Sequence, residues 1–185
     1  MELQQYRDRQ LRNLTSAIGV YALCDLDEIP IYVGQSMDGI RTRVRRHLTS
    51  ARSDVIANRQ LDVWEIAYVW AWPMAGALRD QVNGVEQHLT HEYHSQHPLM
   101  NGIFLPKPSH NVIVPDRQMV RVLPEEEIER RKDPTLRLPR QAAQFNNLFS
   151  WILEVKNNEE LRRTLEAHFD RLQRYYLDFM ARYES

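Results

Sequence analysis

Two short apolar runs near the start of the chain predict a β-hairpin. The runs, Gly19–Cys24 and Ile31–Gln35, are separated by an acidic turn that contains Pro30. Apolar runs joined by such a turn are typical of paired antiparallel strands. Each run carries a tyrosine close to a glycine, and pairing would bring the phenols of Tyr21 and Tyr32 together at one edge of a sheet.

The pattern that follows predicts two helices around a third strand. Apolar residues recur every four positions in Ile40–Arg52, which indicates an amphipathic helix with one narrow buried stripe. Large and small side chains alternate in Leu61–Pro73, as in a strand, and Ala77–Tyr93 returns to helical spacing. We therefore expect an α/β (α+β) fold, with a three-stranded, mainly antiparallel sheet flanked by helices.

The remaining sequence divides around this small domain. Residues 1–17 are predicted to form an N-terminal helix or arm, and residues 18–105 the domain itself. Residues 106–140 are rich in proline and resemble a linker or wrap. Residues 141–185 are predicted to form a C-terminal region of two amphipathic helices, which either pack on the domain or pair with a second copy of the chain.

Length and cysteine content narrow the class of protein. A chain of 185 residues holds one ordinary domain with an appendage, and its core is large enough to fold without disulfides. The single cysteine, Cys24, excludes an internal disulfide and favours a reducing, cytoplasmic setting. The first residues are polar and charged, and no apolar run matches a membrane span, so we expect neither a secretory signal nor a membrane partner.

Positive charge is concentrated on the predicted helix Ile40–Arg52, although the formal net charge of the chain is only −1. Four arginines of this region are candidate DNA contacts: Arg41, Arg45, Arg46 and Arg52. A local basic patch is sufficient to bind phosphates, because affinity depends on the contacted face. The alternative interpretation is an ordinary solvated helix face.

The spacing of several polar residues resembles one nuclease family. Gly19-Val20-Tyr21 and Tyr32-Val33-Gly34, followed by Arg43 and His47 on the next helix, are similar to the GIY-YIG nucleases, with valine in place of isoleucine in both tripeptides. The resemblance covers residues 18–101 and places Glu86 and Asn101 at the family's metal-binding glutamate and supporting asparagine. It implies a metal-dependent DNA endonuclease.

The resemblance also assigns roles to these residues. Glu86 would hold Mg²⁺ (or Mn²⁺), which prefers oxygen ligands, and Arg43 would stabilise the phosphate with its planar donor fork. Tyr32 and His47 would jointly activate water, and Tyr21 would orient water or phosphate. DNA is the expected partner.

The sequence pattern alone does not decide which arginine and which glutamate belong to the site. Arg43 shares a flank of its helix with His47, but Arg41 competes with it because one extra residue after Gly34 shifts the register. Glu86 and Glu92 both border the apolar stripe of their helix, and only the resemblance selects Glu86.

Two other functions compete with the nuclease. His88, His91, His94 and His97 surround Glu92 and suggest a zinc protein, but a step of three residues rotates each side chain by about 60° on a helix. The four therefore cannot face one ion. The other competitor is a catalytically inactive DNA-binding or protein-interaction module on the same fold. Because one site cuts one strand, the C-terminal helices are also a candidate dimer surface.

Overall fold

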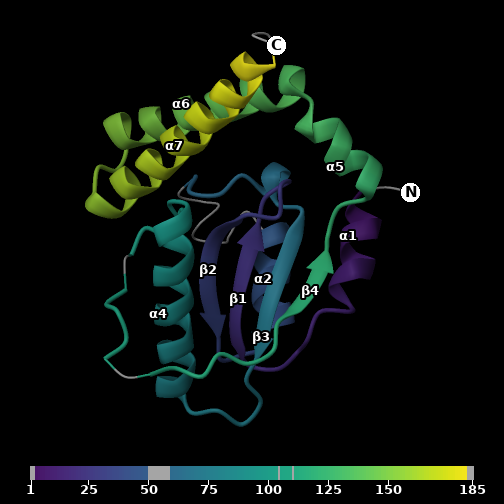
Figure 1. Ribbon diagram of the computed structural model, residues 1–185, viewed down its shortest axis with the longest axis vertical. Helices are drawn as coiled ribbons and strands as arrows, with labels where there is room; N and C mark the ends of the chain where they lie inside the picture. Colours follow the sequence, from purple (N-terminus) through teal and green to yellow (C-terminus); the bar gives the residue numbers. More distant parts are fainter. Residues whose placement is uncertain (1–2, 50–58, 104, 110, 183–185) are drawn as a thin grey trace.

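An antiparallel sheet forms the centre of the computed structural model, which describes residues 3–49, 59–103, 105–109 and 111–182 (Figure 1). The strands are β1 (Gly19–Cys24), β2 (Pro30–Ser36), β3 (Tyr68–Pro73) and β4 (Gln118–Arg121). The helices are α1 (Leu3–Leu11), α2 (Ile40–Thr49), α4 (Arg79–Gln96), α5 (Glu125–Lys132), α6 (Pro134–Glu154) and α7 (Glu159–Ala181), with a 3-10 helix, η1 (Val63–Glu65).

The sheet has four strands in the order β2-β1-β3-β4, and every neighbouring pair is antiparallel. The α+β class and the β1–β2 hairpin are confirmed, but the expected count of three strands is wrong. The additional strand, β4, pairs with β3 from Tyr68 opposite Arg121 to Ala71 opposite Gln118. It comes from the stretch 106–140 that was expected to be a linker or wrap, so this stretch completes the sheet.

The third strand is shorter than its alternating pattern predicts. Leu61–Pro73 was expected to be extended throughout, but regular pairing begins at Tyr68. Asp62 ends the preceding loop as the cap of η1, where its Oδ1 accepts a hydrogen bond from Trp64 N at 3.0 Å. A side chain that satisfies a backbone N–H in this way favours a turn over a strand.

Helices α4 and α2 cover opposite faces of the sheet (Figure 1). On the α2 face, Ile40, Val44 and Leu48 are buried, as their four-residue spacing predicts. On the α4 face, Trp70 and Trp72 pack against Tyr93 of α4, with ring centroids 5.8 and 6.1 Å apart from the Tyr93 ring. These tryptophans belong to the core and are not available to stack on bases.

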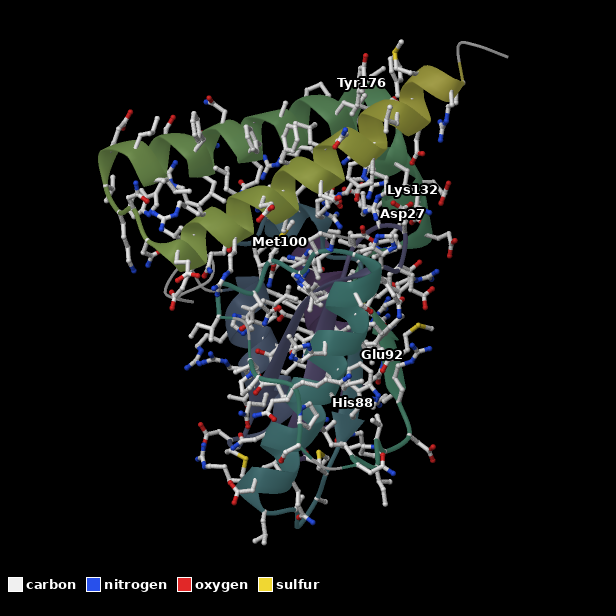
Figure 2. The ribbon with its side chains drawn as sticks, turned by 60° about the vertical axis from the view of Figure 1, so that its left-hand side comes forward. Asp27, His88, Glu92, Met100, Lys132 and Tyr176 are labelled. Carbon is white, nitrogen blue, oxygen red and sulfur yellow. The ribbon has the colours of Figure 1, made fainter. Side chains whose placement is uncertain are left out.

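Helices α6 and α7 form a hairpin that lies across one end of the sheet (Figure 1). α6 begins at Pro134, well before the expected Gln141, because the Asp133 side chain accepts a hydrogen bond from Thr135 N at 2.8 Å and caps its first turn. Figure 2 shows Met100 directly beneath the hairpin, and its carbonyl accepts a hydrogen bond from Thr164 of α7 at 3.3 Å. The hairpin therefore packs on the domain.

Buried charges fix this hairpin to the sheet. Arg171 of α7 donates to Asp25 Oδ2 at 2.8 Å, and Arg137 of α6 donates to Asp27 Oδ2 at 2.6 Å and to Glu65 Oε2 at 3.2 Å. Burial acts to raise the pKa of Asp25, but the guanidinium groups of Arg171 and Arg137 outweigh it and lower that pKa. The turn after β1 is thus an ionic anchor for the C-terminal helices.

None of the helices in the described part of the chain combines the length and the apolar character needed to cross a membrane.

Candidate active site

Two phenols and an imidazole from three elements form a compact cluster. The hydroxyl of Tyr21 on β1 lies 2.7 Å from Nε2 of His47 on α2. The ring of Tyr32 on β2 completes the group, with its centroid 6.3 Å from that of Tyr21 and 5.7 Å from that of His47. The hairpin and the following helix therefore bring together the side chains that the sequence proposed.

Gly34 makes the close approach of the phenols possible. It lies opposite Tyr21 in the β1–β2 register. A Cβ atom at this position would lie 2.7 Å from the Tyr21 hydroxyl oxygen and 2.9 Å from Cε1 of Tyr32. Because these distances are shorter than a carbon contact allows, any larger residue would displace the rings.

The geometry favours Arg43 over Arg41 as the arginine of the site. Arg43 lies close enough to Tyr21 to lower the pKa of its phenol, and the buried Nε of Arg43 has no acceptor among the described residues. Arg41 instead donates through Nε to the Leu14 carbonyl at 2.7 Å, which ties α2 to the loop before β1. A buried guanidinium N–H without an acceptor is the feature expected of an anion site, since buried donors are normally paired.

Burial keeps the Tyr21 phenol protonated. It raises the pKa of Tyr21 well above the ordinary value; the neighbouring Tyr32 adds to this rise, while Arg43 opposes it. Because the phenol keeps its proton at neutral pH, Tyr21 can donate it to His47 Nε2 when that nitrogen carries no hydrogen. His47 is itself buried, so it does not meet solvent water directly. Of the two phenols, Tyr32 is the partly exposed one.

Glu86 lies on the other side of β2, bound to Gln35. The Gln35 Nε2 donates to Glu86 Oε2 at 2.8 Å and to Asn83 Oδ1 at 2.7 Å. Burial raises the pKa of Glu86 to about 6, and the hydrogen bond from Gln35 partly opposes that rise. Glu86 also raises the pKa of Tyr21, so the carboxylate and the phenol lie within electrostatic reach of one another. Since β2 is an edge strand, a single strand separates the two groups.

The donor set around Glu86 fits a hard divalent cation. Gln35 and Asn83 add amide oxygens to the carboxylate, and oxygen ligands are those that Mg²⁺ prefers. Oε1 of Gln35 is buried and has no hydrogen-bond partner among the described residues. An amide oxygen left in this state beside a carboxylate is well placed to bind a cation.

Gln35 and Asn83 were not singled out from the sequence. Two signals could have found them: Gln35 directly follows Gly34, and Asn83 precedes Glu86 by three residues on the same helix face. Glutamine and asparagine are both common on protein surfaces, so these two residues point to a site only once their grouping with Glu86 is known.

Asn101 supports the strand and does not contact Glu86 in the hydrogen bonds of the described residues. Its Oδ1 accepts from Val33 N at 3.0 Å, and its Nδ2 donates to the Val33 carbonyl at 2.6 Å. The preceding residue continues this pairing, because Met100 N donates to the Ile31 carbonyl at 2.7 Å. Asn101 therefore closes the free edge of β2, which is a supporting role on the strand and not on Glu86.

The arginines expected to contact DNA lie in different surroundings. Arg45 and Arg46 are exposed on α2, and Nε of Arg45 lies 3.6 Å from Asp8 Oδ1 of α1. Arg52 lies outside the described residues. Arg41 is the one whose side chain serves the fold, through its bond to Leu14.

The three histidines of α4 and His97, which caps its C-terminal end, have separate partners, as their spacing predicts. His88 pairs with Glu92 at 3.5 Å on the outer side of the helix (Figure 2), and His97 hydrogen-bonds Arg174 at 2.9 Å. His91 bonds the Leu105 carbonyl, and His94 accepts from Leu99 N. Across the described residues, no three His, Cys, Asp or Glu side chains are grouped to share an ion.

No protein-family model, curated protein or solved structure matches this chain.

Proposed function

We propose that this protein is a metal-dependent DNA endonuclease that hydrolyses phosphodiester bonds. The proposal is carried by two groups on the two sides of the edge strand β2. One is the cluster of Tyr21, Tyr32 and His47 with Arg43 beside it, and the other is Glu86 bound to Gln35. Each of these residue types alone is common in a core or on a surface. Together the two groups offer donors, a proton acceptor and a carboxylate at one edge of the sheet.

The residues divide the chemistry as follows. Arg43 binds the phosphate, because its Nε is buried without an acceptor among the described residues. The partly exposed phenol of Tyr32 orients the attacking water. His47 accepts the proton that the water loses. Because His47 is buried, this proton reaches it through the Tyr21 phenol, which is hydrogen-bonded to Nε2: Tyr21 gives its own proton to His47 and takes up the one from water.

Glu86 holds the cation, with Gln35 and Asn83 beside it. A divalent cation bound there neutralises charge that develops on the phosphate. At neutral pH the Glu86 carboxyl is ionised, since its pKa is about 6. Cation binding and cleavage should therefore weaken as the pH falls through this value.

A plasmid-nicking assay tests the function. Purified protein with Mg²⁺ or Mn²⁺ should convert supercoiled DNA to the open circle, and EDTA should stop the reaction. Glu86→Gln should slow nicking by about 100-fold or more. Glu92→Gln is the matched control, because Glu92 is an exposed carboxylate on the same helix, and it should cleave like the wild type. Nicking that survives Glu86→Gln would remove Glu86 from the metal site.

The burial of Tyr21 and His47 favours a second candidate, a DNA-binding module without cleavage. Both side chains contribute to the core on the α2 face, which is a sufficient structural role for them. Such a module would retard a labelled duplex in a gel and leave plasmid intact with either metal. DNA as partner and the cytoplasm as location are common to both candidates.

A further inference from the structure

The α6–α7 hairpin has an apolar surface turned away from the sheet. The inner side of α7 is buried against the domain through Thr164, His168, Arg171 and Tyr175. The neighbouring side, next to α6, carries Phe169 and Tyr176, which are 54% and 50% exposed. Figure 2 shows Tyr176 on the side of the hairpin that faces away from the sheet. Large aromatic side chains with this exposure are unusual on a monomer unless they serve an interface.

The same surface continues onto α6. The Phe145 ring lies 5.9 Å from that of Phe169 and stacks on Phe149 at 6.1 Å, so the apolar side chains of the two helices touch. Between them lies an open groove of about 540 Å³. We define the outer face as Leu138, Ala142, Phe145 and Phe149 of α6 with Leu165, Phe169, Leu172 and Tyr176 of α7.

The spacing along the outer face is that of a helical interface. In both helices the successive positions are four, three and four residues apart. Apolar residues in alternating steps of three and four form the seam by which helices pack in bundles and coiled coils. The two strips meet between α6 and α7, where Leu165 packs against the cluster of Leu148, Ile152 and Leu161, while Phe149, Phe169 and Tyr176 remain exposed.

We infer that the outer face binds a second copy of this chain, so that two hairpins form a four-helix bundle. A two-fold contact places a surface against itself, and a charged patch would then repel its own copy. The groove is lined by Leu138, Pro139, Ala142, Phe169, Leu172, Gln173 and Tyr176, none of which carries a charge. An acidic or basic partner would find nothing to pair with here.

The size of the outer face predicts a weak dimer. From Leu138 to Phe149 it covers about 17 Å of α6 at about 1.5 Å per residue. Two packed helices are about 20 Å wide, so the face measures roughly 340 Å², less than the roughly 800 Å² that each partner buries in a standard interface. The inference is independent of the proposed chemistry, because it uses no residue of the site.

Light scattering after size-exclusion chromatography tests the dimer. At tens of micromolar the full chain should have twice its mass of 22.0 kDa. Phe169→Glu and Tyr176→Glu should each raise the dissociation constant by about 100-fold or more and give monomers, because a carboxylate would be buried against an apolar surface. Arg163→Glu is the control: it changes an exposed residue on α7 outside the outer face and should stay dimeric. A monomeric wild type, or a dimer that withstands both glutamates, would overturn the inference.

A spin label gives an answer even if the glutamate variants unfold. Cys24 is buried, so in Gln173→Cys the new thiol is the one that reacts with a label. Pulsed electron paramagnetic resonance should then detect one label-to-label distance in the dimer, short enough for labels on facing hairpins. The same label at Asp38, on the loop before α2, should give a longer distance. A short distance at Asp38 and none at Gln173 would place the contact elsewhere and refute the proposal.

Discussion

Burial gives Glu86 and Tyr21 different states at neutral pH. Burial raises the pKa of both groups. The pKa of Glu86 reaches only about 6, whereas the pKa of Tyr21 rises well above the ordinary value of 10.0 for a phenol. Glu86 is therefore a carboxylate under conditions in which Tyr21 is a phenol. One residue is suited to hold a cation, and the other to pass a proton to His47.

Glu86→Gln should stabilise the protein when metal is absent. Because burial penalises the charged carboxylate, the free energy of unfolding of the wild type falls as the pH rises from the ordinary pKa of 4.5 through about 6. Glutamine keeps an acceptor for Gln35 and has no charge. Urea unfolding in EDTA should show a gain of about 2 kcal/mol at about pH 8 and almost none near pH 4.5. An equal gain at both pH values would contradict the raised pKa.

Gly34→Ala should disrupt the site with little change elsewhere. The added methyl group would overlap the Tyr21 hydroxyl and the Tyr32 ring, and such crowding costs about 1–3 kcal/mol. We expect this loss in urea unfolding and a loss of nicking. Gly76→Ala is the comparison: a Cβ there meets no atom within 4 Å, although its φ of 76° adds backbone strain, so nicking should persist. Full activity of Gly34→Ala would show that the phenols need not meet over β2.

The residues of the site that could be predicted are those that occur in a recognisable order along the chain. Tyr21, Tyr32, Arg43 and His47 follow from the hairpin and the helical spacing. Gln35 could not be predicted, because its meaning comes from a contact with Glu86 that is distant in sequence. Asn101 was expected in a supporting role, but its partner could not be predicted, because it is the backbone of Val33, which no side-chain pattern reveals.

At the scale of elements, the C-terminal helices are held by ions as well as by apolar packing. Arg171 is buried, and besides Asp25 it donates to the Tyr175 hydroxyl at 2.6 Å and to Glu65 at 3.3 Å. Burial raises the pKa of Glu65, while Arg137 and Arg171 act to lower it. Breaking one side of such a cluster leaves a buried charge without compensation.

Arg171→Met should therefore cost about 3–5 kcal/mol in the free energy of unfolding, because Asp25 loses its closest cation. Arg163→Ala, which removes an exposed arginine paired with Glu159 on the same helix, should cost less than about 1 kcal/mol. Urea denaturation at neutral pH compares the two. Equal, small losses would mean that the hairpin is held by apolar contacts alone.

The elements that the sequence predicts well are those with a local pattern. The β1–β2 hairpin and the buried stripe of α2 need only neighbouring residues. β4 lacks such a pattern, and it forms because β3 offers a free edge and because Gln118 accepts a hydrogen bond from Thr15 N at 2.8 Å across the chain. The first residues of Leu61–Pro73 alternate like a strand, but the hydrogen bond from Trp64 N to the Asp62 side chain starts the 3-10 helix η1 there instead.

At the scale of the whole molecule, the edge strand β2 and the outer face of the hairpin lie on separate parts of the structure. The first carries the proposed chemistry, and the second carries the proposed contact with another copy. One site breaks one strand, so a dimer would bring two sites to one duplex. The monomeric variants Phe169→Glu and Tyr176→Glu should then nick DNA but accumulate few linear products.

The most direct test of the proposed site is the cleavage rate of Arg43→Ala beside that of Arg45→Ala. Both substitutions remove one positive charge from α2, but Arg43 is near enough to Tyr21 to lower its pKa, whereas Arg45 is exposed and lies beside Asp8. Single-turnover cleavage of an end-labelled duplex with Mg²⁺ should fall by about 100-fold or more for Arg43→Ala and by less than about tenfold for Arg45→Ala. Equal losses, or a wild type that cleaves with neither Mg²⁺ nor Mn²⁺, would contradict the account.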